Sequence, residues 1–186
     1  MRRRTMLILG GAVVLVLALA APSFARSGAA FGPQARASAP AGGWKLKLTG
    51  KRTKVLPIAK VPAVVKWDGT KAGNINPSLR YVYKGQLLYK LVGLVDDTKA
   101  GFNVARAKKG YKIQFICRDG YKPTMSSKLL FRKGKLRKDL IVAKIKAGKL
   151  LPSGEAPFRF VGGKPITQPF NNKLSARMVV QIRLIF

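Results

Sequence analysis

The stretch "YKIQFICRDGYKPTMSSKLL", residues 111–130, decides the fold class because it alternates apolar and polar residues before an Asp-Gly turn. Successive side chains of a β-strand point to opposite faces. Tyr111, Ile113, Phe115 and Cys117 therefore share one face, and the pattern predicts a strand over residues 111–118. Other segments of the chain show similar patterns, and together they predict the fold class.

Cys117 is the only cysteine of the chain, and its parity places it on the apolar face of that strand. Free cysteine is among the residue types most often buried, so we expect a core position. The alternative is a partly exposed thiol at the strand end, whose pKa the adjacent Arg118 would lower. Arg118 points to the opposite face, which weakens that alternative.

Five more segments are predicted as strands: Trp44–Gly50, Arg80–Tyr83, Leu140–Ile145, Phe158–Val161 and Arg177–Ile185. The period changes at Gln86, where Leu87, Leu88, Leu91, Val92 and Val95 recur at helical spacing and predict one short amphipathic helix. Strands outnumber helices and do not alternate regularly with them. We therefore expect an α+β fold, a mostly β single domain with a few short helices.

The first 43 residues differ from the rest in composition. Residues 1–25 combine "MRRR", an apolar run and the small residues of "PSFA", which is typical of a signal peptide. The apolar run is shorter than the roughly 20 residues of a membrane span, although an uncleaved anchor is the alternative. Residues 26–43 are rich in Gly, Ala and Pro and predict a flexible linker. The folded domain is expected over residues 44–186, secreted or in the cell envelope.

Positive charge dominates the composition, with 37 Lys and Arg, 6 Asp and Glu and a formal net charge of +31. Such a surface attracts anions. For an exported protein we expect an anionic lipid surface, cell-wall polymer or extracellular polysaccharide rather than nucleic acid. The alternative is that lysines scattered over most turns and strands only keep the surface solvated.

One run, "FRKGKLRK" over residues 131–138, is denser in cations. Its candidate polyanion-binding residues are Arg132, Lys133, Lys135, Arg137 and Lys138. A short charged loop can equally be only solvated. No aromatic residue alternates with these cations, which argues against a stacking platform for single-stranded nucleic acid.

Several classes of catalytic site are excluded by composition. The chain has no histidine, which rules out Ser-His and Cys-His nucleophile pairs and histidine-ligated metals. Glycine-rich phosphate loops are also missing. The adjacent carboxylates Asp96 and Asp97 are expected to end a helix and turn the chain rather than to bind a divalent cation, which needs several converging oxygen ligands. We assign no catalytic or metal-binding residue.

The order of these segments resembles the molybdopterin-binding domain of sulfite oxidase-like oxidoreductases. The segments that carry the resemblance are "WKLKLTG", "YVYKGQLLYKLVGLV", "GYKIQFICRDGYKPTMSSKLL", "LIVAKIKAGKLLPSGEAPFRFV" and "MVVQIRLI". The matching positions are Gly85, Leu88 and Leu91; Asp119, Gly120 and Tyr121; Ala143, Gly148, Leu151 and Pro152; Pro157 and Arg159. The resemblance covers nearly all of residues 44–186, and its weight lies in the order of the motifs.

The resemblance implies a fold, but the chain departs from the family at its chemistry. Catalytic members supply a cysteine ligand to molybdenum before the "x-G-x-x-L" strand and helix, and residues 49–79 have no cysteine. Molybdopterin remains possible by resemblance. The candidate residues for contacting such a cofactor are Cys117, Arg118, Asp119 and Arg159, with Arg80 and nearby lysines as further phosphate contacts.

Three functions follow from these observations. The first is a non-catalytic binding or structural module of this fold. The second is a basic surface protein that binds anionic envelope polymers. The third is a molybdopterin-dependent oxidoreductase with an atypical site, which would need the Cys117 thiol to line a pocket.

Overall fold

The computed structural model describes residues 43–71, 79–163 and 174–186. The predicted signal peptide and all but the last residue of the predicted linker lie outside the described residues. No helix within the described ranges is both long enough and apolar enough to cross a membrane. The described residues belong to one compact unit, in which strands predominate.

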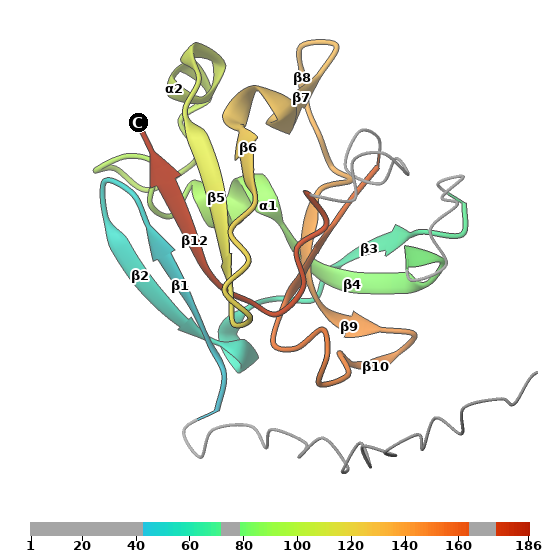
Figure 1. Ribbon diagram of the computed structural model, residues 1–186. Helices are drawn as coiled ribbons and strands as arrows, with labels where there is room; N and C mark the ends of the chain where they lie inside the picture. The colour runs from blue at the N-terminus through green and yellow to red at the C-terminus, as the bar shows by residue number, and fades with distance from the viewer. Residues whose placement is uncertain (1–42, 72–78, 164–173) are drawn as a thin grey trace, which may run out of the picture. The chain divides into compact units, whose positions relative to one another are not determined.

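Sheet A has five strands in the order β2 (Thr53–Pro57), β1 (Lys45–Thr49), β12 (Val179–Ile185), β5 (Lys112–Cys117) and β6 (Thr124–Ser126). β1 runs parallel to β12, and the other neighbours are antiparallel. The first and last strands of the described chain therefore lie side by side in the middle of this sheet (Figure 1).

Sheet B has the order β10 (Lys149–Leu150), β9 (Ile141–Lys146), β4 (Val82–Leu87) and β3 (Val65–Asp68), and β11 (Arg159–Val161) also pairs with β9. A small hairpin consists of β7 (Phe131–Arg132) and β8 (Lys135–Leu136). The helices are α1 (Leu88–Val92) and α2 (Val104–Lys109), with 3-10 turns η1 (Ile58–Lys60) and η3 (Ser127–Leu130).

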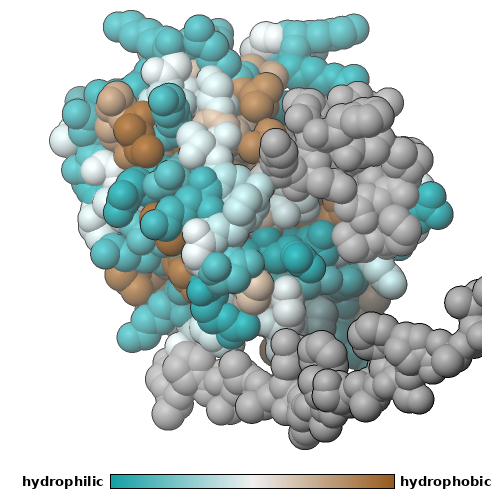
Figure 2. Space-filling view, viewed as in Figure 1, coloured by the Kyte–Doolittle hydropathy of each residue, from teal (hydrophilic) through white to brown (hydrophobic). Residues whose placement is uncertain are grey.

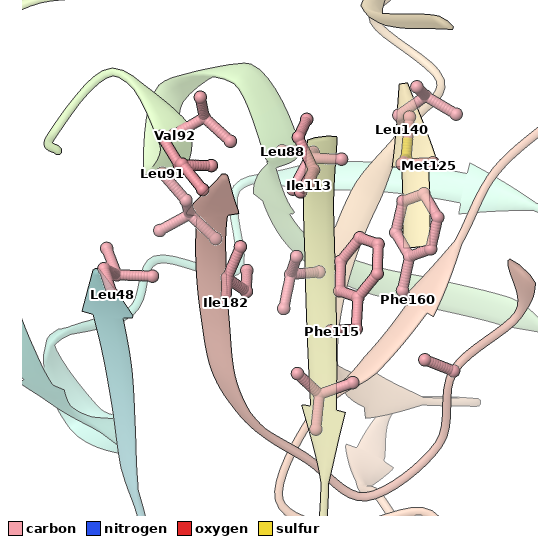
Figure 3. Packing of buried hydrophobic residues seen from close by; sticks show 14 of the residues in the cluster. Leu48, Leu88, Leu91, Val92, Ile113, Phe115, Met125, Leu140, Phe160 and Ile182 are labelled. Carbon is pink, nitrogen blue, oxygen red and sulfur yellow. The ribbon is translucent and has the colours of Figure 1, made fainter. Parts of the chain in front are cut away.

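The main core lies between sheet A, α1 and the strands β9 and β11 of sheet B (Figure 3). Phe115 of β5 stacks on Phe160 of β11, with ring centroids 4.4 Å apart. Leu88 of α1 is fully buried in the same cluster. A second cluster, on the other face of sheet B, contains Trp67 and Tyr83. The prediction of a mostly β single domain with a few short helices is confirmed.

Strands are found where alternation or a short apolar run predicted them, at β1, β5, β9, β11 and β12. The predicted start of the helix at Gln86 is too early, because β4 continues through Gly85 to Leu87 before α1 begins. The register with β9 shifts between Lys84 and Gly85. A Cβ at Gly85 would collide with the backbone of Val142 and Ala143, so glycine permits this close strand contact.

The prediction that Cys117 occupies a core position is confirmed. Its side chain is 3% exposed and belongs to the main core. Burial, with a further contribution from Asp119, raises the pKa of the thiol to about 12. The alternative of a thiol activated by Arg118 is therefore wrong.

Candidate polyanion-binding face

All six carboxylates of the chain take part in local interactions. Asp68 accepts from Thr70, Asp96 and Asp97 from Asn103, Asp119 from the Tyr121 amide, Asp139 from Arg137, and Glu155 from Lys146. Asp119 is the only one of the six that is exposed, while the other five are half-buried or buried. The lysines and arginines at the surface therefore face solvent with few carboxylates among them.

The outer face of sheet A, which points away from the main core, carries several exposed cations. Leu46 and Leu48 of β1 point into the core, so the alternate residues Lys45 and Lys47 point outward. The same alternation places Lys112 of β5 and Arg183 of β12 on this face. All four side chains are exposed, and the five strands contain no Asp or Glu.

The strand register places neutral polar groups and exposed apolar side chains between these cations, with Val55 opposite Lys47 and Ile185 opposite Lys112. Arg183 lies opposite both Thr49 and Gln114 in the neighbouring strands. Lys47 lies opposite Gln181, whose amide donates to the Thr49 hydroxyl at 3.0 Å. Separate positive charges with amide and hydroxyl groups between them match a polymer that carries both anionic groups and hydroxyls.

Aromatic side chains that are exposed or half-buried lie near both ends of sheet A. At one end the Arg118 guanidinium lies 5.1 Å from the ring centre of Trp44, and Tyr121 is 43% exposed. At the other end Phe186 is 53% exposed and the Lys51 ammonium lies 4.9 Å from its ring. The seven residues of β12 extend about 23 Å between the two ends.

A hollow of about 470 Å³ adjoins the Phe186 end of the face. Three lysines line it, Lys109, Lys112 and Lys128, together with Ser126. These cations come from the end of α2, the start of β5 and the 3-10 turn η3. The hollow therefore offers a concave place where several ammonium groups surround one anionic group.

The predicted cluster of cations at residues 131–138 forms the β7–β8 hairpin. Lys133 and Gly134 make its two-residue turn with φ of 50° and 75°. Arg132, Lys133, Lys135 and Lys138 are exposed, beside a hollow of about 630 Å³. Hydrophilic side chains cover most of the described surface seen in Figure 2, and hydrophobic ones form only small groups.

Arg137 differs from the other four members of the predicted cluster. Its side chain is buried and makes two hydrogen bonds to Asp139, Nε to Oδ1 at 2.9 Å and Nη2 to Oδ2 at 2.6 Å. Burial favours a higher pKa for Asp139, but these bonds outweigh it and lower the pKa. The assignment of Arg137 as a polyanion contact is therefore corrected to a structural ion pair.

Asp96 and Asp97 help to hold the loop between α1 and α2. Asp96 and Asp97 follow α1, and both accept hydrogen bonds from Asn103, the residue that caps α2. Asp96 is fully buried, and this burial raises its pKa. In the described ranges no three metal-binding side chains lie close together.

The four candidate cofactor-binding residues lie in different surroundings. Cys117 points into the main core, and Arg118 donates to the Ser153 carbonyl at 3.2 Å. Asp119 accepts the Tyr121 amide in the turn after β5. Arg159 is 2% exposed and lies in a buried ion-pair cluster.

Arg159 belongs to a buried ion-pair cluster on the second face of sheet B. Its Nη1 lies 2.8 Å from Glu155 Oε2 and 3.2 Å from the Tyr83 hydroxyl. Lys146 contacts the other oxygen of Glu155 at 2.6 Å. Burial favours a higher pKa for Glu155, but the two cations outweigh it and lower the pKa. The carboxylate thus neutralises the arginine that the resemblance offered to a phosphate.

This chain matches no protein-family model and no curated protein. Sequence reasoning located the hairpin cations but missed the outer face of sheet A. The polar positions of β1, β5 and β12 were visible by alternation, but their adjacency depends on β1 pairing with β12 across the whole described chain.

Proposed function

We propose that this protein is a non-catalytic, extracytoplasmic binding module for an anionic polymer of the cell envelope. The observation that carries the proposal is the outer face of sheet A, where Lys45, Lys47, Lys112 and Arg183 are exposed among neutral polar and apolar residues. A face about 23 Å long suits an extended polymer. The hollow at its Phe186 end supplies a second contact for an anionic group.

The arrangement of carboxylates supports the same target. A surface that only needs solubility is served by charges of both signs, whereas here the carboxylates are held in structural bonds. Like-charged side chains directly opposite in a sheet destabilise it. Lys66 of β3 nevertheless lies opposite Lys84 of β4, and Arg132 lies opposite Lys135 in the hairpin.

The fold of a sulfite oxidase-like molybdopterin-binding domain is part of the proposal. Its support is that the motif residues occupy framework positions: Gly85 at the close contact of β4 with β9, Asp119 in the turn after β5, and Gly148 in the β9–β10 turn with φ of 81°. Catalysis through Cys117 is disfavoured because its thiol is buried and its pKa is raised.

Binding of long-chain inorganic polyphosphate and of a carboxylated polysaccharide such as polygalacturonate tests the proposal. The test variant is Lys47→Glu/Lys112→Glu/Arg183→Glu. The control, Lys84→Glu/Lys99→Glu/Lys149→Glu, changes three exposed lysines outside sheet A and has the same net charge. We expect the test variant to bind at least about tenfold more weakly and to lower the salt slope by about three.

Each result has a distinct meaning. Equal weakening in both triple variants would overturn the assignment to this face and leave only bulk charge. Failure of the unaltered protein to bind either polymer in low salt would overturn the function. Binding to anionic phospholipid vesicles without binding to soluble polymers would replace the polymer with a membrane surface.

A further inference from the structure

We propose that the pocket between β2, η1 and α1 binds an amphipathic anion, a single acyl chain with a carboxylate or phosphate head. The inference is independent of the polymer-binding face, because Leu56 of β2 lies opposite the core residue Leu46 and so lines the pocket from the core side of sheet A. Its volume is about 450 Å³, within the 300–1,000 Å³ that is usual for small-molecule sites.

The walls of the pocket are apolar and come from separate segments of the chain. Leu56 comes from β2, Leu91 from α1, and Leu94 and Phe102 from the loop after α1. Tyr89 and Phe102 pack edge to face with ring centroids 5.7 Å apart. Burial of a ligand's methylene groups against such side chains favours binding by about 0.8 kcal/mol for each CH₂.

The polar residues of the pocket are cations and one amide. Lys60 and Lys90 are exposed, and Gln86 is half-buried. No carboxylate lines the pocket. The two lysines attract a negatively charged ligand head and repel a positively charged one. We therefore expect the pocket to bind an anion.

Two contacts that do not involve a ligand position the walls of the pocket. Lys144 of β9 donates from its ammonium to the Ile58 carbonyl at 2.9 Å, which fixes the turn η1 beside Lys60. On the opposite side Gly93 lies against the backbone of Phe102, where a Cβ would approach its Cα to 2.7 Å. Glycine at residue 93 therefore allows the wall residue Phe102 to close on α1.

Isothermal titration with dodecanoate below its micelle concentration tests the inference. Dodecyltrimethylammonium tests the need for negative charge, and butyrate tests the need for a chain. We expect one dodecanoate per protein, and at least tenfold weaker binding of the other two. Lys60→Glu/Lys90→Glu and Leu94→Trp should each weaken dodecanoate binding at least tenfold, the first by reversing the charges and the second by filling the pocket.

The control Lys84→Glu/Lys149→Glu has the same net charge as the double pocket variant and should bind dodecanoate unchanged. Near-ultraviolet circular dichroism and the melting temperature establish that each variant folds. Equal binding of the cationic amphiphile, several dodecanoates per protein, or unchanged binding in folded Leu94→Trp would overturn the inference. The pocket variants should retain polyphosphate binding, so failure of this inference is distinguishable from failure of the proposed function.

Discussion

Cys117 lies on the apolar face of β5 with its thiol almost wholly buried. A buried thiol reacts only when the structure opens locally, because the reagent must reach the sulfur and a base must remove its proton. We expect the native protein to react with a thiol reagent at pH 8 more slowly than the unfolded protein by about two orders of magnitude or more. Labelling kinetics with and without denaturant measure this ratio.

The raised pKa of Cys117, about 12, also gives stability a pH dependence. In the unfolded chain the thiol ionises near its ordinary pKa of about 8.5, whereas in the native state it stays protonated. The native state thus binds more protons between these values, and its free energy of unfolding falls as pH rises from about 8.5 toward 12. Cys117→Ala lacks this contribution, and an identical alkaline decline in that variant would contradict the assignment.

At the scale of elements, alternation in the sequence predicted the strands that have one face in the core. β1, β5 and β12 each bury alternate residues, so their patterns are visible without a structure. The edge strand β2 buries no residue fully, and its sequence "TKVLP" carries no such pattern. The helix α2 fully buries only Ala107, which leaves no apolar stripe to detect.

Short strands were missed because their positions depend on partners and turns. β7, β8 and β10 have two residues each, too few to show a period. Lys133 and Ala147 adopt positive φ in the β7–β8 and β9–β10 turns. Asn or Asp is the usual residue at such positions, so these turns could not be recognised from the sequence. The end of β4 was misjudged because an apolar stripe beginning at Leu87 serves a strand end and a helix equally well.

The start of α2 supplies a test of an element held by a cap. The side chain of Asn103 accepts the Arg106 amide at 2.9 Å and donates to Asp97 at 2.5 Å. Asn103→Ala removes both bonds and should lower the free energy of unfolding by about 1–2 kcal/mol. Urea denaturation measures the change.

Two further variants separate the roles of Asn103. Asn103→Ser keeps an acceptor for the cap but loses the donor to Asp97, so its loss of stability should be smaller than that of Asn103→Ala. Val104→Ala, at the exposed first residue of α2, should change stability little. A loss in Asn103→Ala no larger than in Val104→Ala would mean that the cap contributes nothing.

At the scale of the whole molecule, charge could be predicted from the sequence but its placement could not. Composition shows the excess of cations, and the run at residues 131–138 shows one dense segment. The ion pair of Arg137 with Asp139 and the burial of Arg159 beside Glu155 depend on tertiary contacts. The outer face of sheet A likewise exists only because strands from both ends of the described chain meet.

Repulsion among the remaining cations should make stability depend on salt. The Debye length falls from about 30 Å at 0.01 M to about 8 Å at 0.15 M ionic strength, so the free energy of unfolding should rise mainly over this range.

Lys84→Glu places a carboxylate opposite Lys66 and should stabilise the protein by about 0.2–1 kcal/mol in low salt. This stabilisation should be smaller at 0.15 M. Lys84→Gln removes a charge without adding one of the opposite sign, so it should stabilise the protein less than Lys84→Glu. Urea denaturation at both salt concentrations measures these differences, and a stability independent of salt would show that the cations are too far apart to repel.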